Sequence, residues 1–432
     1  MNGSHERIQH MTQEQVNAAM RSLPGTPQRG PFYALTFPNF RLFFYGQTIS
    51  VAGTWMQTVA QQWLVWQLTQ SAFWLGLVSG ANAVPFVLLT VWGGQVADRY
   101  PRQKVLACTQ WVALLQASLL AVLATSWLIP IQAWHVTVLA ATNGLINAFA
   151  LPAQQALVPE LLEDRTALSN AIALNSLRFN LARVLGPALA GVVLTRFDAA
   201  TCFALNAVSY LAVILSLQRM RLPPPQRQPQ HSPVWEGAHY LRSNPAILRV
   251  VALVGAGAAF GWSVATLYPA FAREFGTDAA GYSRMMTFNG IGAATGGLTL
   301  ALLADRLPRH GMIFGGASLF AGALWILASA PSYPIALGSL VLSGFAMIVF
   351  GISSNTRVQE EAPDHLRGRV MAIYSLVFQG AMPVGGLAIG ALASHTGIRQ
   401  AVRIYVLLFS AAILIALTAF LSDRTQRHRQ RS

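Results

Sequence analysis

Charged side chains are scarce in this chain of 432 residues, because Asp, Glu, Lys and Arg together make up only 10% of it. A soluble globular protein carries roughly 25% of such residues. A large soluble core cannot explain the deficit, since the surface of a folded chain grows with its length and must meet water. Hydrophobic residues make up 54%, and the mean hydropathy is +0.45. The composition therefore predicts a protein whose surface is solvated mostly by a lipid bilayer.

Patterns typical of catalytic and metal sites are also missing. The only cysteines, Cys108 and Cys202, lie in separate apolar stretches and form neither metal-ligand spacing nor a disulfide framework. The sequence holds no GxxxxGK[ST] phosphate loop, no serine elbow and no HExxH pair. We therefore expect no enzyme activity, no direct ATP drive, no metal and no cofactor.

What the chain does contain is a series of long apolar stretches. A membrane-crossing helix needs about 20 mostly apolar residues. The sequence predicts an all-α, polytopic membrane protein with twelve transmembrane helices in two six-helix bundles. The predicted spans are 40–68, 71–96, 103–127, 132–157, 166–194, 198–217, 247–271, 280–303, 310–330, 333–356, 368–394 and 399–421.

Polar segments separate the predicted domains. A stretch rich in Pro, Arg and Gln between the sixth and seventh spans is typical of a linker, and it has room for a short interfacial helix around Trp235 to Leu241. The opening residues lack the continuous apolar run of a secretory signal peptide. The expected divisions are a cytoplasmic segment 1–36, a bundle 37–218, a cytoplasmic linker 219–245, a bundle 246–421 and a basic cytoplasmic tail 422–432.

Basic residues gather on one side of the predicted spans. Of the 29 basic residues, all arginines except Lys104, 22 fall on the side shared by the two termini, five on the other side and two inside the fifth span. Loops rich in Lys and Arg stay in the cytoplasm, so both termini are predicted to be cytoplasmic. Membrane topology thus accounts for the net charge of +14 without a nucleic-acid partner.

The two halves carry the same short motif. The second span ends in GGQVADRYPRQK (93–104) and the eighth in LLADRLPRHG (302–311), and both contain Ala-Asp-Arg-x-Pro-Arg. A repeat at matching places indicates duplication, so we expect the two bundles to share one fold and to be related by pseudo-symmetry.

These motifs carry a family resemblance. Gly94-x-x-Ala97-Asp98-Arg99-x-Pro101-Arg102-x-Lys104 resembles the signature loop of the major facilitator superfamily, with Pro101 where the family usually has Gly. The second copy is degenerate, since Ala301 replaces Gly94. Gly186-Pro187-x-x-x-Gly191 looks like the family's antiporter-associated glycine motif. The opening FPNFRLFFYGQTISVAGTWMQTVAQQWLVWQLT (37–69) is similar to the exporter branch that includes the enterobactin exporter and macrolide efflux proteins.

The resemblance implies a secondary active transporter of the bacterial inner membrane and a gating role for the repeated loop. Asp98 lies at a helix end beside Arg99 and Arg102, where it can pair with them or meet the N-terminus of a neighbouring helix. Such a latch can hold the halves together in one state and release them in another. A basic loop that only sets topology is the alternative. The predicted latch comprises Gly94, Asp98, Arg99, Arg102, Lys104, Asp305, Arg306 and Arg309.

Arg178 and Arg183 are the most unusual side chains, because both fall inside the fifth span. A buried arginine costs at least ~2.5–3.5 kcal/mol on insertion scales, so each should face a wet cavity or a partner. Their spacing of five residues puts them about 140° apart on a helix, so they cannot point the same way. Recognition of an anionic or polar cargo is one interpretation, and snorkelling or structural pairing is the other.

Uncharged polar and aromatic side chains in several spans are candidates to line a central cavity. Polar groups in hydrocarbon prefer the bundle interior, so hydrogen bonding between helices is the alternative for each of them. The candidates, beside the two arginines, are Trp55, Gln57, Gln61, Gln62, Asn143, Asn147, Trp262, Tyr268, Asn289 and Gln379. The residues expected to permit close, sliding helix contacts are Gly186, Pro187, Gly191, Gly385, Gly386 and Gly390.

Acidic residues are absent from the middle of every predicted span, since all fifteen fall in termini, loops or span ends. Proton-coupled transporters commonly place a titratable carboxylate within the membrane. Proton antiport is therefore implied by the resemblance alone, with Asp98, Asp305, Glu160 and Glu361 as candidate proton sites.

Together these features favour a monomeric, proton-driven exporter of a small amphipathic organic molecule, such as a siderophore or a drug, that works by alternating access. A lipid or lysolipid flippase is one alternative. A non-transporting membrane scaffold or sensor is another, although a scaffold needs no two-state loop of the kind that is duplicated here.

Overall fold

Long helices make up almost all of the computed structural model, which describes residues 30–127, 129–222, 235–303, 306–363 and 366–429. All regular structure in these ranges is helical, and they contain no strand. The all-α fold class predicted from the apolar stretches is therefore confirmed. The helices coincide with the predicted spans to within a few residues at most boundaries.

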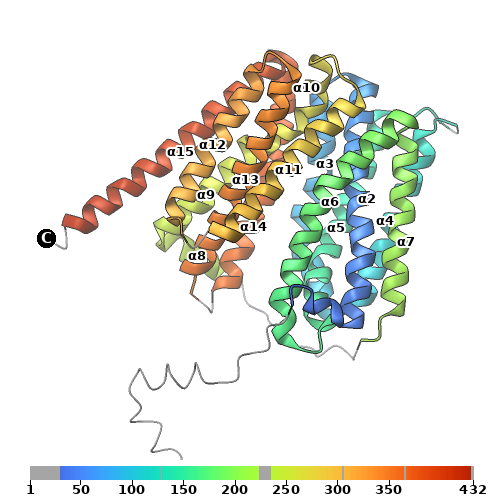
Figure 1. Ribbon diagram of the computed structural model, residues 1–432, viewed down its shortest axis with the longest axis horizontal. Coiled ribbons are helices and arrows are strands. Elements are labelled where there is room, and N and C mark those ends of the chain that lie inside the picture. Colours follow the sequence, from blue (N-terminus) through green and yellow to red (C-terminus); the bar gives the residue numbers. More distant parts are fainter. Residues whose placement is uncertain (1–29, 128, 223–234, 304–305, 364–365, 430–432) are drawn as a thin grey trace, which may run out of the picture.

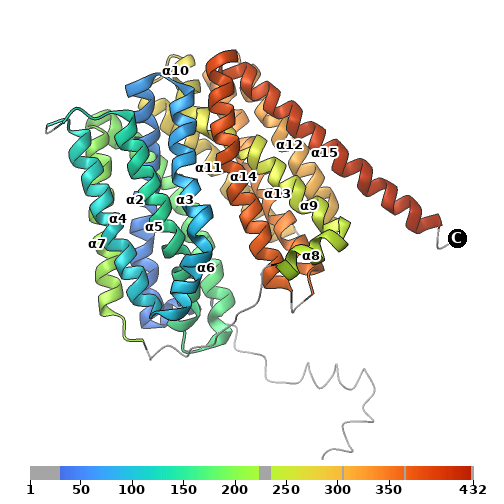
Figure 2. The ribbon, with the colours of Figure 1, turned by 180° about the vertical axis from the view of Figure 1, so that it is seen from behind.

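The helices form two bundles that stand side by side (Figures 1 and 2). The N-terminal bundle, here called the N half, begins with a short 3-10 turn and then packs six long helices. Its elements are η1 (Tyr33–Thr36), α2 (Pro38–Thr69), α3 (Ala72–Arg99), α4 (Arg102–Ala124), α5 (Ala133–Leu157), η2 (Val158–Leu161), η3 (Arg165–Ala167), α6 (Leu168–Arg196) and α7 (Ala199–Arg219).

The C-terminal bundle, here called the C half, repeats this arrangement after the linker helix α8 (Trp235–Ser243). Its last helix, α15, tilts away from the bundle toward the C-terminus (Figure 1). The elements are α9 (Pro245–Phe260), η4 (Trp262–Leu267), α10 (Tyr268–Glu274), α11 (Ala279–Leu303), α12 (Arg309–Ser329), α13 (Tyr333–Glu361), α14 (Arg367–Thr396) and α15 (Ile398–Arg429).

Several helix starts follow directly from the sequence. Pro38 and Pro245 occupy the first turns of α2 and α9, where a missing N–H costs no hydrogen bond. The Asp198 side chain accepts a hydrogen bond from the backbone N–H of Thr201 at the start of α7, and Asn244 caps α9 in the same way.

Eleven spans in the described residues are long and apolar enough to cross a membrane, counting α9 to α10 as one. Helix α2 is a further long helix beside these eleven spans, and its 32 residues extend about 48 Å. Its polar side chains, among them the buried Gln47, Gln57 and Gln61, lower its hydropathy, yet they face other helices and not lipid. Large apolar side chains such as Leu115 and Ile415 instead cover the outside. The chain is therefore a polytopic membrane protein.

The seventh span is broken near its middle. Helix α9 ends at Gly261, a 3-10 turn follows, and α10 begins at Tyr268. Pro269 has no backbone N–H, so a continuous α-helix through this point would leave a carbonyl without its partner. The break places Trp262 at the start of the 3-10 turn η4 and Tyr268 at the start of α10.

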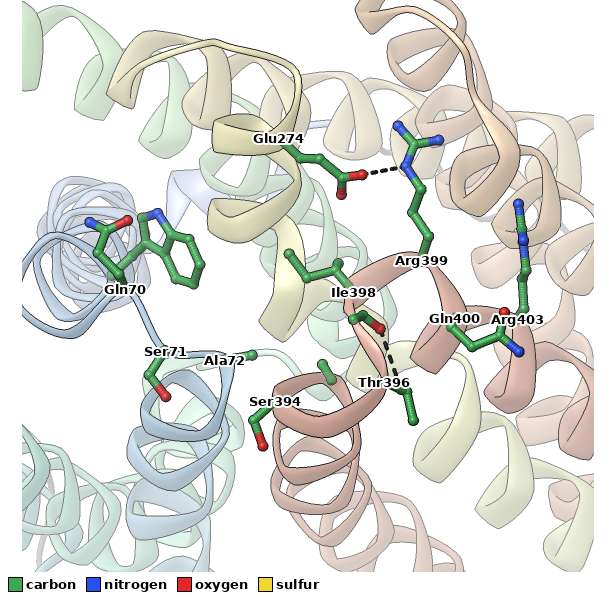
Figure 3. Close-up of a pocket in the computed structure, with 13 residues that line it drawn as sticks. Gln70, Ser71, Ala72, Glu274, Ser394, Thr396, Ile398, Arg399, Gln400 and Arg403 are labelled. Atoms are coloured by element: carbon green, nitrogen blue, oxygen red, sulfur yellow. Dashed lines mark hydrogen bonds and ion pairs between the residues drawn. The ribbon is translucent and has the colours of Figure 1, made fainter.

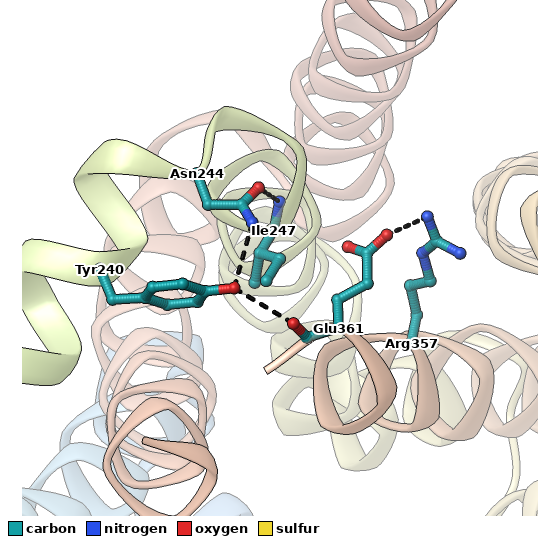
Figure 4. Close-up of polar contacts among 5 residues, drawn as sticks. All are labelled: Tyr240, Asn244, Ile247, Arg357 and Glu361. Carbon is teal, nitrogen blue, oxygen red and sulfur yellow. Dashed lines mark hydrogen bonds and ion pairs between the residues drawn. The ribbon is translucent and has the colours of Figure 1, made fainter. Parts of the chain in front are cut away.

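The linker helix α8 belongs to the C half by its contacts. The Tyr240 hydroxyl donates to the carbonyl of Glu361 at the end of α13 (3.1 Å) and accepts a hydrogen bond from the Asn244 side chain (3.2 Å) (Figure 4). Glu236 forms an ion pair with Arg369 of α14. A short helix is thus present where the sequence predicted one, and it is anchored to α13 and α14 of the C half.

The molecule has two faces, which we name by their contents. The linker face carries the start of α2, the α3–α4 connection and the linker helix α8; the far face carries the α2–α3 and α14–α15 turns. The halves lean together toward the far face in both views (Figures 1 and 2).

Candidate functional site

The two halves meet at two helix–helix contacts, α3 with α14 and α6 with α11, which together are here called the seam. The first of them joins α3 to α14. A Cβ added to Gly76 would lie 2.5 Å from the carbonyl oxygen of Gly386, and one added to Gly390 would lie 2.6 Å from that of Ala72. Real Cβ atoms do not approach backbone so closely, so only glycine permits this contact. All four residues lie in the far-face ends of their helices.

The second contact joins α6 to α11, also near the far face. A Cβ on Gly191 would lie 2.9 Å from the Cβ of Ser283. Beside it, the Trp63 ring of α2 stacks on Tyr282 of α11 with centroids 6.2 Å apart. Because both contacts lie toward the far face, the structure is closed on that side.

The predicted sliding glycines divide between this seam and the interiors of the halves. Gly191, Gly386 and Gly390 are at the seam. Gly186 packs against Trp55 inside the N half, with Pro187 next to it in α6, and Gly385 packs against α9 inside the C half. The seam also uses Gly76, which the sequence reading missed. A Gly-x-x-x-Gly pattern with Gly80 is the signal that could have identified it.

Arg183 lies about midway along α6 and reaches across the seam. Its Nη2 donates to Asn289 Oδ1 of α11 (3.0 Å) and lies 3.6 Å from the sulfur of Met347 on α13. Its guanidinium carbon is 6.0 Å from the ring centroid of Trp55 on α2. The buried Tyr268 is close enough to interact with it electrostatically. In the part of the chain that the structure describes, every partner of Arg183 is neutral and none is a carboxylate.

Arg178 points elsewhere, as its spacing from Arg183 requires. It is only 5% exposed, and its guanidinium carbon lies 5.7 Å from the ring centroid of Phe43 on α2, inside the N half. Its Nε and Nη1 atoms are buried without a hydrogen-bond partner. The two arginines therefore occupy different environments: one joins the halves and the other is enclosed in one of them.

Gln57 was predicted as a candidate cavity residue, but the structure places it inside the N half. It donates to Gln116 of α4 (3.3 Å) and accepts from Asn206 of α7 (2.7 Å). These bonds connect three helices of one bundle, so the alternative of interhelical hydrogen bonding applies to it. Gln62 likewise bonds to Ser79 of α3 (3.1 Å).

The other candidates of the N half are more dispersed. Gln61 is buried, Asn143 is partly buried and Asn147 is exposed on α5. In the C half, Asn289 meets Arg183 at the seam and also donates to the carbonyl of Leu340 (3.3 Å). Gln379 is partly buried on α14. Among the predicted cavity candidates in the described residues, the pair Arg183 and Asn289 is joined by a direct side-chain hydrogen bond.

Trp262 occupies an aromatic cluster in the C half. Its ring centroid lies 5.2 Å from those of Phe320 and Phe378 and 5.7 Å from that of Phe350. These edge and tilted contacts fix η4 against α12, α13 and α14. The cluster packs around the broken seventh span. Tyr268, which interacts with Arg183, directly follows η4 in the sequence.

The predicted latch loop lies at the linker face, away from the seam. Asp98 is exposed and makes no hydrogen bond or ion pair with the described residues. Arg99 and Lys104 are exposed as well, and a Cβ on Gly94 would meet no atom within 4 Å. In this state the loop is open to solvent.

Arg102 has a partner other than the expected Asp98. It forms an ion pair with Glu160 after α5 and donates to the carbonyl of Ala156 (3.2 Å). The reason is local packing: Arg102 begins α4, whose first turn lies against the end of α5.

The second copy of the motif repeats this arrangement, because Arg309 begins α12 and pairs with Glu360 at the end of α13 (2.5 Å). The duplicated arginine thus ties neighbouring helices within each half. Sequence reasoning missed Glu360 because it lies outside the motif. Arg306 is exposed, and Asp305 lies outside the described residues.

The described residues contain no group of His, Cys, Asp or Glu side chains that could hold a metal ion. The described spans likewise carry acidic residues only at their ends. The side chains gathered around Arg183 are a cation, an amide, a thioether and aromatic rings, which can bind and orient a molecule.

Comparison with known proteins identifies the family. A family model described as a transmembrane secretion effector matches residues 29–430. The chain belongs to this family of the major facilitator superfamily. Its relatives are transporters, and this protein is a transporter and not an enzyme. The expected resemblance is thereby confirmed.

Two curated relatives illustrate the similarity of this facilitator. It is 25% identical over 396 residues to the staphyloferrin A transporter of Staphylococcus aureus (strain NCTC 8325 / PS 47), covering 89% of this chain and 96% of that protein. It is 28% identical over 364 residues to the enterobactin exporter EntS of Escherichia coli O6:K15:H31 (strain 536 / UPEC), covering 82% and 84%.

Solved structures establish the fold. The D323A mutant of the nucleoside transporter NupG aligns with a TM-score of 0.71 at 14% identity, covering 90% of this facilitator and all of that chain. A bacterial homologue of the iron transporter ferroportin aligns with a TM-score of 0.66 at 15% identity, covering 89% and 98%.

Proposed function

We propose that this facilitator exports a small amphipathic molecule with an acidic group, of the siderophore class, and that protons drive the export. The observation that carries the proposal is Arg183: a central cation, bonded across both halves, whose partners are all neutral. The names of the relatives support siderophores as the cargo class.

Arg183 suits an acidic cargo for an electrostatic reason. A guanidinium in a low-dielectric setting is stabilised most by an anion, and a carboxylate matches its planar fork of donors. Amide and thioether partners leave that stabilisation unfulfilled. The neighbouring Trp55 ring offers an apolar surface for the rest of an amphipathic molecule.

The proposed direction of transport assigns a side of the membrane to each face. We propose that the linker face is cytoplasmic, because it carries most of the basic residues. The state described here is closed at the far face, so it would receive cargo from the cytoplasm. Opening the seam would then release the cargo outside.

Asp98 is the carboxylate best suited to a proton-linked latch. Glu160 and Glu361, the other described candidates, are held in ion pairs with Arg102 and Arg357. Asp98 is exposed and has no partner in this state, so it is free to bind one when the linker face closes. We propose that its engagement stabilises the outward-open state.

The test uses proteoliposomes or inverted membrane vesicles in which the pH gradient can be varied. We expect vesicles with an acidic interior to accumulate an acidic cargo, and we expect dissipation of the gradient to stop the accumulation. Arg183→Gln should abolish transport of an acid while retaining more of the transport of its neutral amide. Equal losses for both cargoes would contradict acid recognition, and accumulation indifferent to pH would contradict proton drive.

A further inference from the structure

A polar pocket lies at the far face, directly above the α3–α14 contact. Its volume is about 680 Å³. Figure 3 shows that one wall, Gln70 to Ala72, comes from the N half and the opposite wall, Ser394 to Gln400, from the C half. The rims are turns with left-handed backbone at Gln70 (φ 47°) and Gly397 (φ 85°). The pocket therefore spans both halves.

Two hydrogen-bond donors in this pocket lack an acceptor. Trp66 is 7% exposed, and its indole Nε1 is buried without a hydrogen-bond partner. The Nε of Arg403 is buried and unpartnered as well. Buried donors of this kind are costly unless a ligand or water supplies an acceptor. Both residues line the pocket, so a ligand bound there could supply an acceptor.

The fixed charges of the lining favour an anion. Arg399 already has partners, since its Nε pairs with Glu274 (2.5 Å) and its Nη1 donates to the carbonyl of Ala330 (2.7 Å). That ion pair is neutral as a whole, and it leaves Arg403 as the uncompensated charge among the lining residues. The side chains of Ser71 and Ser394 add further polar groups.

We propose that this far-face pocket binds a small carboxylate-bearing molecule and that its occupancy holds the seam closed. The walls belong to different halves, and the floor is the Ala72–Gly390 contact. Opening the far face must separate the walls and dismantle the pocket. A ligand that binds only one state stabilises that state.

The biological consequence rests on the proposed function. If the far face is external and the cargo is acidic, exported cargo that accumulates outside would occupy this pocket and slow its own export. The pocket would be distinct from the Arg183 centre, because its lining contains no residue of that centre.

The first experiment measures binding of 1-naphthaleneacetate to the full chain in lipid nanodiscs by equilibrium dialysis, with 1-naphthaleneacetamide as a neutral probe of similar shape. We expect the acid to bind about tenfold or more tightly than the amide. Arg403→Gln and Trp66→Phe should each remove the pocket's share of this preference, because hydrogen bonds to charged groups carry it. Equal binding of acid and amide would overturn the proposal.

A second pair of variants tests the dependence on closure. Gly390→Leu changes none of the residues that line the pocket, but its side chain prevents the close approach of α14 to α3. It should therefore abolish the pocket's share of acid binding. Gly338→Leu is the matched control, because a Cβ there meets no atom within 4 Å, and it should bind as the wild type does. Retained binding in Gly390→Leu would refute the link to the seam.

Arg183→Gln separates this proposal from the proposed function. It removes binding at the central cation, whereas the share of binding lost in Arg403→Gln should persist. If Arg183→Gln alone abolishes acid binding, the far-face pocket is refuted and the proposed cargo class stands. If pocket binding persists but acidic cargo is never exported, the proposed function fails and the pocket stands.

Discussion

The hydrogen bond from Arg183 to Asn289 should help to hold the far face closed. Asn289→Ala removes this bond and should therefore destabilise the closed state. The bond measures 3.0 Å, has a charged donor and joins α6 of one half to α11 of the other. Hydrogen bonds to charged groups contribute about 1.5–3 kcal/mol. If the bond exists only in the closed state, its loss should shift the ratio of closed to open molecules by roughly 10- to 150-fold.

The shift can be measured as a distance between spin labels on opposite halves. Trp127 and His395 are exposed at the far face, one on each half, and can be replaced by cysteine for labelling in a background with Cys108→Ser and Cys202→Ala. Pulsed electron paramagnetic resonance in nanodiscs should show a longer distance gaining population in Asn289→Ala.

Asn206→Ala is the matched control for this measurement. Asn206 is a buried amide that donates to Gln57 (2.7 Å), but both partners lie inside the N half. Its loss should lower the free energy of unfolding without changing the distance distribution. The reasoning fails if Asn289→Ala leaves the distribution unchanged, or if Asn206→Ala shifts it as much.

Three further predictions concern the latch and the seam. Asp98→Asn should abolish transport in vesicles without loss of expression, and near-normal flux would refute the latch. Gly76→Ala should block closure of the far face and stop transport, since its Cβ would lie 2.5 Å from a backbone oxygen, whereas Gly322→Ala, with open space around it, should transport normally in the same assay. Arg102→Glu should lower the melting temperature, and adding Glu160→Arg should restore part of it, because the pair joins α4 to the end of α5; no recovery in the double variant would contradict that role.

The fold could be predicted because lipid imposes one strong condition on sequence: a spanning helix must be long and apolar. That condition led to twelve predicted spans, and eleven spans in the described residues are long and apolar enough to cross a membrane. Helix α2 shows where it weakens, since its glutamines face the bundle interior and reduce its hydropathy. The break at Gly261 and Pro269 could not be placed from apolar content alone, because it lies inside a single apolar stretch, Pro245–Glu274, that is long enough to cross a membrane.

The candidate site was predictable in its residue types more than in its partners. An arginine inside a span is conspicuous, so Arg178 and Arg183 were found from the sequence, and their spacing required different directions. Which one reaches the seam depends on how α6 is rotated against α11, and no local pattern encodes that rotation. Gln57 illustrates the same gap: its amide looks like a cavity residue until Asn206, far away in sequence, is seen beside it.

The neutrality of Arg183's partners bears on how loading could be coupled to opening. An acid that binds this guanidinium competes with Asn289 for Nη2, so a bond between the halves is exchanged for a bond between the N half and the cargo. The seam then keeps its glycine contacts but loses its central hydrogen bond, and the closed state is destabilised relative to the open one. A carboxylate supplied by the protein at this point would have satisfied Arg183 permanently and made the cargo redundant. Under the proposed function, the absence of acidic side chains from the middle of the described spans is therefore a condition for cargo-dependent opening.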